Sequence, residues 1–133
     1  MTTPEKNRIL VIDDEKIIAD TLVLIFCHAG YEARPAYSAE QALESLTTGE
    51  WIPQLAIIDV RLPGMNGVDL AIRLKAEYPD MRLSLFSGQA ATSELLDVAR
   101  LNGHTFDVLA KPVHPTEFLG LASRLLSSPG ARE

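Results

Sequence analysis

Acidic, hydroxyl and amino side chains follow short apolar runs at four places in this sequence. In chain order, the residues are Asp13, Asp14, Asp59, Ser87 and Lys111. If the apolar runs are parallel strands of one sheet, these side chains meet at its carboxyl edge, where open α/β sheets bind their ligands. Three carboxylates placed together repel one another unless a cation joins them, and hard oxygen ligands of this kind suit Mg²⁺.

The same residues could carry a phosphoryl transfer. A cation between Asp14 and Asp59 would neutralise an incoming phosphoryl group, so that a carboxylate oxygen can attack it. Lys111 would supply a second positive charge, and Ser87 a hydrogen bond to a phosphoryl oxygen. Taken singly, an acidic pair is more often a helix cap, and Ser-Gly or Lys-Pro is more often a turn. Only the convergence of all of them on one sheet edge predicts the chemistry.

Five apolar runs alternate with amphipathic stretches and predict the elements that position these residues. The runs cover 8–13, 31–36, 55–59, 82–86 and 105–110. In the first helical stretch, three-and-four spacing relates the following residues: Ile17, Ile18, Thr21, Leu22, Ile25 and Phe26. Later helices are expected from a Ser38 cap to Gly49, around 68–75, over 92–101 and over 118–126.

Strands that alternate with helices predict an α/β fold. We expect a three-layer sandwich whose five-stranded parallel sheet has the order 2-1-3-4-5, with five helices. The predicted domain covers residues 7–128, with short tails at 1–6 and 129–133.

Composition restricts the possible partners and environment. The net charge is −6 and no basic patch stands out, which disfavours direct binding of nucleic acid by this domain. No apolar run approaches the ~20 residues that span a bilayer, and no apolar signal region begins the chain. The single cysteine, Cys27, permits no disulfide within the chain and is expected to pack in the first helix. The sequence predicts a soluble cytoplasmic protein without membrane contact.

The chain resembles the receiver domains of bacterial two-component response regulators, which have a flavodoxin-like fold. The motifs that carry the likeness are Ile12-Asp-Asp-Glu15, the segment from Asp59 to Gly67, Ser87-Gly88 and Lys111-Pro112. The resemblance implies that Asp59 is the phosphoacceptor. It also implies that Mg²⁺ is held by Asp14, Asp59 and the main-chain carbonyl of Arg61, with Asp13 contributing indirectly. Lys111, before a cis Pro112, would pair with the phosphoryl group, and Ser87 would swing toward it.

One position departs from the family pattern. Many receivers carry Tyr or Phe three residues before the lysine, and this chain has Val108. Phe106 lies on the same side of the expected strand and could take that role. Arg61 and Gln89 occupy positions that, in the family, tune the lifetime of the aspartyl phosphate.

The resemblance implies a sensor histidine kinase or a histidine phosphotransfer protein as the donor, and a downstream target protein. We expect phosphorylation to change partner binding, or to promote a dimer, on the face of the fourth and fifth helices. Candidate contacts, some of them in the core, are Leu95, Leu96, Ala99 and Phe118. The domain could act alone or as part of a longer regulator.

Three other functions agree less well with the sequence. A phosphatase or mutase with an aspartyl-phosphate intermediate would carry a second Asp two residues after the nucleophile, where this chain has Arg61. A P-loop hydrolase would need a Gly-rich loop that ends in Gly-Lys-Ser/Thr, which is absent. A receiver that binds partners without phosphorylation would usually lack an acidic residue or the lysine. The sequence therefore predicts a phosphoaccepting signalling domain rather than an enzyme.

Overall fold

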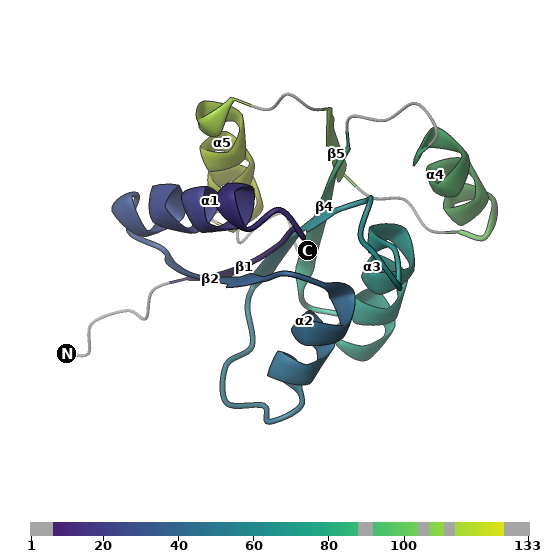
Figure 1. The fold of residues 1–133 in the computed structure, drawn as a ribbon, viewed down its shortest axis with the longest axis horizontal. Helices are drawn as coiled ribbons and strands as arrows, with labels where there is room; N and C mark the ends of the chain where they lie inside the picture. The colour runs from purple at the N-terminus through teal and green to yellow at the C-terminus, as the bar shows by residue number, and fades with distance from the viewer. Residues whose placement is uncertain (1–6, 88–91, 104–106, 111–113, 127–133) are drawn as a thin grey trace.

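A computed structural model describes residues 7–87, 92–103, 107–110 and 114–126 of the chain. Strands alternate with helices along the chain (Figure 1). The strands are β1 (Arg8–Ile12), β2 (Glu32–Ala36), β3 (Leu55–Asp59), β4 (Arg82–Ser87) and β5 (Asp107–Ala110). The helices are α1 (Lys16–His28), α2 (Ala39–Leu46), α3 (Gly67–Glu77), α4 (Thr92–Leu101) and α5 (Pro115–Leu126).

The strands form one parallel sheet in the order β2-β1-β3-β4-β5. This confirms the predicted α/β fold and strand order. The order reverses direction between β1 and β3, which places the ends of these two strands at the point where open α/β sheets bind ligands.

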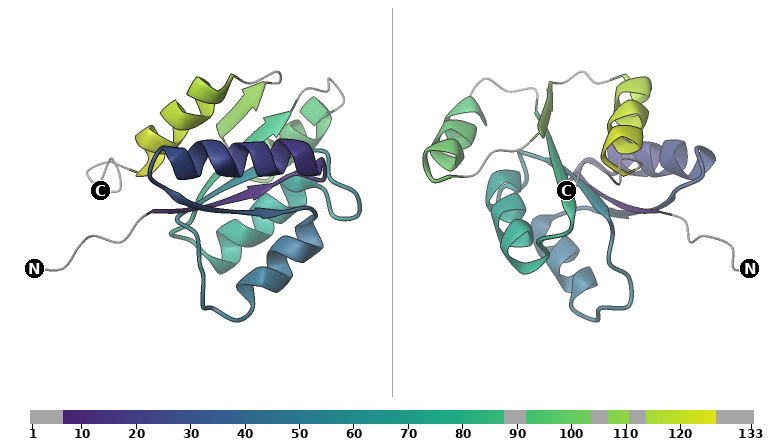
Figure 2. Two further views of the ribbon diagram at one scale, coloured as in Figure 1. Left: turned by 60° about the vertical axis from the view of Figure 1, so that its left-hand side comes forward. Right: turned by 180° about the vertical axis from the view of Figure 1, so that it is seen from behind.

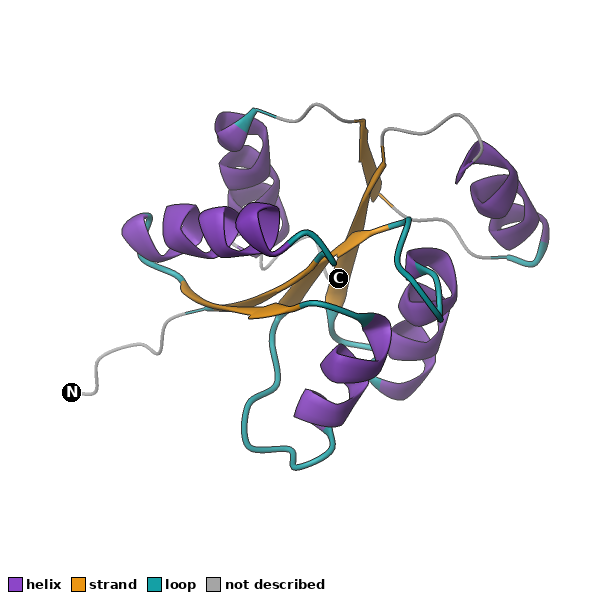
Figure 3. Ribbon diagram, in the orientation of Figure 1, coloured by secondary structure: helices purple, strands orange, loops and turns teal. Residues whose placement is uncertain are grey.

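Helices cover both faces of the sheet. Figure 2 shows α1 and α5 on one face and α2 and α3 on the other, with α4 beyond α3. Two apolar clusters fill the two interfaces, and strand β3, which contributes to both, is buried along its whole length. This two-sided burial explains why β3 is nearly uniform in Leu, Ile and Ala rather than alternating with polar residues. Helices and strands are distinguished by colour in Figure 3.

The helix signals in the sequence mostly agree with the structure. Ser38 caps α2, where its Oγ accepts a hydrogen bond of 3.0 Å from the backbone N–H of Gln41. Gly30 follows α1 with φ at +101°, the left-handed conformation that suits a glycine after a helix. Asn66 also caps α3 through the N–H of Asp69, a cap that the sequence reasoning did not identify.

The buried face of α1 is narrower than the apolar spacing of its sequence indicates, and it corrects the prediction for Cys27. The buried residues are Ala19, Leu22 and Phe26, whereas the side chain of Ile17 is 83% exposed. Cys27 is exposed as well, so the expectation that it is a packing residue of the first helix was wrong. Because neighbouring residues on a helix point about 100° apart, the burial of Phe26 turns Cys27 away from the sheet.

Within the residues that the structure describes, no helix is both long and apolar enough to cross a membrane.

Candidate functional site

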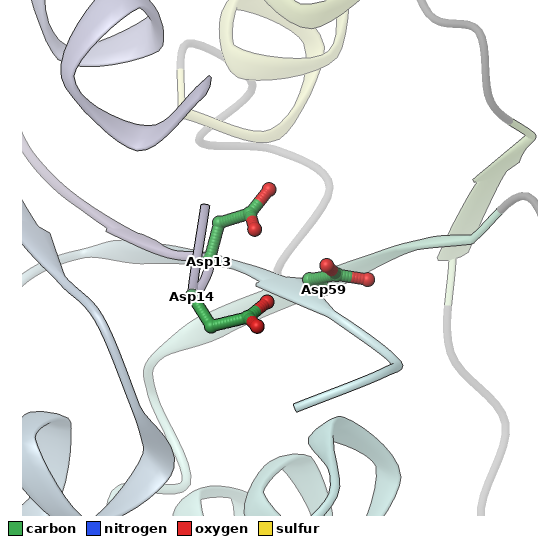
Figure 4. Close-up of side chains that lie close together, drawn as sticks. All are labelled: Asp13, Asp14 and Asp59. Carbon is green, nitrogen blue, oxygen red and sulfur yellow. The ribbon is translucent and has the colours of Figure 1, made fainter. Parts of the chain in front are cut away.

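Asp13, Asp14 and Asp59 gather where β1 and β3 end. Ile12 pairs with Ile58 in the sheet, so Asp13 follows β1 at the level of Asp59, the last residue of β3. The backbone N–H of Asp13 still bonds to the carbonyl of Ala36 at 3.0 Å, which fixes its position beside β2. One carboxylate oxygen from each aspartate lies within 4.8 Å of the others (Figure 4). The structure therefore brings together the three acidic residues that the sequence singled out.

Burial differs among the three carboxylates. Asp13 is fully buried and Asp59 is 3% exposed, whereas Asp14 is exposed. Two carboxylates out of water beside a third that faces solvent form a strongly negative cluster that opens to one side. Several closely spaced oxygen ligands with access to water form a donor set that could hold a hard divalent cation.

Backbone N–H groups orient two of these carboxylates. Oδ1 of Asp13 accepts a hydrogen bond of 2.9 Å from the N–H of Glu15, and Oδ1 of Asp59 accepts one of 3.1 Å from the N–H of Arg61. The N-cap residue of α1 is Glu15, which makes no side-chain cap bond. Asp13 and Asp14 therefore do not serve as the N-cap residue of α1, which removes the simplest structural explanation for the acidic pair.

The backbone after Asp59 is held at two points. The N–H of Val60 donates to the carbonyl of Phe86 at 3.0 Å, and the N–H of Gly67 donates to the carbonyl of Val60 at 2.9 Å. A Cβ atom on Gly67 would lie 2.1 Å from the carbonyl oxygen of Asp59, so only glycine allows α3 to begin this close to β3. Arg61, in the segment between them, is exposed.

The remaining predicted site residues are only partly placed. Ser87 ends β4 opposite Ala110 of β5, and nothing further is described for its side chain. Lys111, Pro112, Gln89 and Phe106 lie outside the described residues. Their expected roles stay predictions.

The predicted partner surface is partly core. Ala99 and Phe118 are 3% and 4% exposed, so these two candidates pack in the interior. Exposed apolar side chains nearby on α4 and β5 are Val98, Leu101 and Val108, at 56%, 87% and 42% exposed. The side chains of Leu95 and Leu96 lie outside the described residues.

A family model described as the response regulator receiver domain matches residues 9–122. The chain belongs to this family. Receiver domains act in the phosphorelay signalling of two-component systems, in which response regulators work with histidine kinases and downstream effectors. This receiver domain is accordingly a signalling domain, as the sequence predicted.

Individual relatives support the assignment. The regulatory protein VanR of Enterococcus faecium is 33% identical over 118 residues, which cover 85% of this chain and 47% of VanR. The DNA-binding response regulator MtrA of Mycobacterium tuberculosis (strain ATCC 25618 / H37Rv) is 31% identical over 114 residues, or 86% of this chain and 48% of MtrA. The chain thus spans about half the length of these curated relatives.

Solved structures agree with the fold. A CheY-like response regulator receiver domain protein from Methanospirillum hungatei JF-1 superposes with a TM-score of 0.83 at 27% identity. The match covers 97% of this chain and all of that one. The receiver domain of NtrX from Brucella abortus has a TM-score of 0.76 at 30% identity, covering 90% of this chain and 98% of that one.

Sequence reasoning missed two residues that lie against the backbone of Asp59 or of the segment that follows it. Gly67 enters the sequence analysis only as the last residue of a motif, although a glycine directly after the Asn66 cap is a signal of close approach. Glu40 lies in the first turn of α2, yet its carboxylate bonds to Met65 in the segment between β3 and α3. No local pattern in the sequence could have identified that contact, because 25 residues separate the two partners.

Proposed function

We propose that this receiver domain accepts a phosphoryl group on Asp59 from a phosphohistidine of a sensor histidine kinase or a histidine phosphotransfer protein. The observation that carries the proposal is the cluster of three carboxylates within 4.8 Å, with Asp59 at the end of the buried central strand β3. Membership of the receiver family supports the choice of donor. The proposed domain spans residues 7–128 and acts in the cytoplasm.

In the proposed transfer, a carboxylate oxygen of Asp59 attacks the phosphorus atom of the donor. A P–O bond forms as the P–N bond to histidine breaks, and the electron pair of the P–N bond stays on the imidazole nitrogen. The N–H of Arg61 bonds to Oδ1 of Asp59, which helps to orient the nucleophile. Ser87 would donate a hydrogen bond to a phosphoryl oxygen and Lys111 would neutralise part of its charge. The domain promotes its own phosphorylation and dephosphorylation without turning over a separate substrate.

The donor set fits Mg²⁺. Asp14, Asp59 and the main-chain carbonyl of Arg61 would hold the ion, with Asp13 contributing indirectly. When bound, Mg²⁺ supplies positive charge that offsets the repulsion between the carboxylates and the incoming phosphoryl oxygens. The exposure of Asp14 leaves that side of the cluster open to solvent.

The proposed output is a change in partner binding on the face of α4 and α5. Val98, Leu101 and Val108 support this choice because all three present apolar surface to solvent. A downstream protein or a second phosphorylated copy of the domain would bind there. Phosphorylation would favour the binding-competent conformation by shifting the equilibrium between two conformations that already exist. MtrA is named as a DNA-binding response regulator, and this chain matches 48% of its length. Control of a DNA-binding domain in a longer regulator is therefore an output consistent with the proposal.

The proposal is tested by intact-mass measurement after incubation with acetyl phosphate, with and without Mg²⁺. The wild-type protein should gain the mass of one phosphoryl group only when Mg²⁺ is present. Asp59→Asn should gain none, because it keeps the shape of the side chain but removes the nucleophilic oxygen charge. Asp80→Asn is the matched control, since Asp80 is an exposed aspartate in a turn after α3, and it should behave like the wild type.

Two results would contradict the proposal. If Asp59→Asn still gained the phosphoryl mass, the acceptor would be another residue. If the wild type gained no mass from acetyl phosphate, from phosphoramidate or from a phosphorylated histidine kinase, the domain would bind partners without phosphorylation.

A further inference from the structure

Glu40 of α2 contacts the segment that follows the proposed phosphoacceptor. Its Oε2 accepts a hydrogen bond of 3.1 Å from the backbone N–H of Met65. The neighbouring Gly64 has φ at +70°, and a Cβ atom built there would lie 2.8 Å from the same oxygen. The carboxylate therefore rests directly against the backbone of residues 64 and 65.

The contacted segment is the β3–α3 loop, residues 60–66. Its ends are fixed by the bond between Gly67 and Val60 and by the Asn66 cap of α3. Between these points Arg61, Pro63 and Gly64 are exposed. The Glu40 carboxylate thus reaches the exposed part of the loop from a different element, four residues beyond the proposed carbonyl ligand.

The negative charge of Glu40 is favoured by the Met65 N–H and by the position of Glu40 in the first turn of α2. Donation by the Met65 N–H lowers the pKa of the Glu40 carboxyl below its ordinary value of 4.5, so the group is ionised at neutral pH. Glu40 also lies in the first turn of α2, where the helix dipole favours a negative charge. A hydrogen bond to an ionised acceptor is stronger than one between neutral groups.

We propose that Glu40 is a positioning residue for the acceptor site, whose carboxylate holds the β3–α3 loop so that the Arg61 carbonyl is preorganised for a divalent cation. The inference rests on the proposed function. Glu40 itself touches neither the cluster of carboxylates nor the reacting atoms. It acts through the loop backbone, because a carbonyl on a loosened loop must be ordered again each time a cation binds.

The test is a Mg²⁺ titration followed by NMR amide shifts, which measures cation affinity without any phosphoryl transfer. The variants are Glu40→Ala, Glu40→Gln and Glu44→Ala. We expect Glu40→Ala to raise the Kd for Mg²⁺ about fivefold, the size expected from losing one exposed charge-assisted hydrogen bond. Glu40→Gln keeps a carbonyl acceptor for the Met65 N–H and should recover most of the affinity. The Met65 amide should exchange with solvent faster in Glu40→Ala than in the wild type.

Glu44→Ala is the matched control for charge. Glu44 is exposed one turn further along α2, and its substitution removes the same charge. Its Kd for Mg²⁺ should stay within twofold of the wild-type value. Thermal unfolding of each variant without Mg²⁺ shows whether the substitution destabilises the whole fold. We expect little change in the unfolding temperature, since Ala is a favourable residue inside a helix.

The proposal is overturned by any of three outcomes. An unchanged Kd in Glu40→Ala would mean that the loop needs no support from α2. Equal weakening in Glu40→Gln and Glu40→Ala, or in Glu44→Ala, would mean that net charge rather than the hydrogen bond matters. The proposed function has its own separate test: phosphorylation of wild-type Asp59 can succeed while the Glu40 variants bind Mg²⁺ normally, and only the positioning role would then fail.

Discussion

Gly67 begins α3 against the backbone of the proposed phosphoacceptor, so closely that an added Cβ atom would lie 2.1 Å from the carbonyl oxygen of Asp59. The same Cβ would lie 2.8 Å from the Cα atom of Val60. Both neighbours are backbone atoms, which cannot turn aside as the end of a side chain can. Any substitution at Gly67 must therefore move α3 or the end of β3.

Gly67→Ala should lower the free energy of unfolding by about 1–3 kcal/mol, the usual cost of forcing an extra carbon into a packed region. It should also slow phosphorylation, because the backbone that carries Asp59 has to shift. Urea denaturation and the rate of phosphoryl mass gain measure the two effects. Gly120→Ala is the control: Gly120 lies within α5 with open space around it, so Ala there should stabilise by about 0.5–1 kcal/mol. Equal stability of Gly67→Ala and wild type would contradict the close approach.

Mg²⁺ should stabilise the folded protein, because the three carboxylates converge only in the native state. At a Mg²⁺ concentration of ten times Kd, the free energy of unfolding should rise by about 1.4 kcal/mol. Asp14→Asn should lose this gain and, without Mg²⁺, should be at least as stable as the wild type, because one source of repulsion is removed. Urea denaturation at constant ionic strength, with and without MgCl₂, provides the measurement. A full Mg²⁺ gain in Asp14→Asn would remove Asp14 from the proposed ligand set.

Tyr37 and Asp20 should give a measurable pH dependence. The Tyr37 hydroxyl donates a hydrogen bond of 2.6 Å to Oδ1 of Asp20, and this bond, with repulsion of the phenolate by Asp20, raises the pKa of Tyr37 above 10.0. Because the pKa of Tyr37 is higher in the folded than in the unfolded protein, the bond contributes its full stability at pH values below the unfolded-state pKa. This contribution is lost as the pH rises through the folded-state pKa. The difference in phenolate absorbance between wild type and Tyr37→Phe gives the midpoint. In Asp20→Asn the midpoint should fall toward the ordinary value, because Lys16, whose Nζ lies 5.0 Å from the ring centre, stays in place and favours the phenolate. An unchanged midpoint would contradict the bond.

Glu32 should stabilise the protein through Trp51 rather than through its ion pairs. Its Oε2 accepts a hydrogen bond of 2.7 Å from Nε1 of Trp51, which is only 7% exposed. The nitrogen atoms of Arg8 and Arg34 lie farther from the carboxylate, at 3.7 Å each. Exposed ion pairs contribute little, but a buried donor without its acceptor is costly. Glu32→Gln should therefore cost less than about 0.5 kcal/mol, and Glu32→Ala about 1–2 kcal/mol, in urea denaturation. Equal losses in the two variants would mean that the ion pairs matter more.

Much of the fold was predictable because its signals are local. Apolar runs that end in Asp13 and Asp59 define buried strands, and residues such as Ser38 and Gly30 mark helix ends through interactions within a few positions of the chain. Alternation of strands and helices then left few topologies, since crossovers between parallel strands are almost always right-handed. The convergence of the three aspartates followed from the parallel sheet.

Other features depended on which surface each element buries. The spacing of apolar residues in α1 allowed both Ile17 and Ile18 on the inner stripe, and Ile17 proved exposed. Trp51, in the segment before β3, belongs to no periodic apolar pattern in the sequence, and the structure buries it beside Glu32 and Arg34. These outcomes depend on the rotation and position of each element against the sheet, which periodicity fixes only to within about one residue.

The sequence by itself determined the family, the strand order and the identity of the acidic residues, because these follow from residue types and their spacing. Only the tertiary structure decided that Gly67 lies close to the backbone of Asp59 and that the Glu40 carboxylate accepts a hydrogen bond from the Met65 N–H. The physical reason is distance along the chain. The sequence pattern around either partner of the contact between α2 and the β3–α3 loop gives no indication of the other partner. The contact forms only when both elements pack on the same face of the sheet.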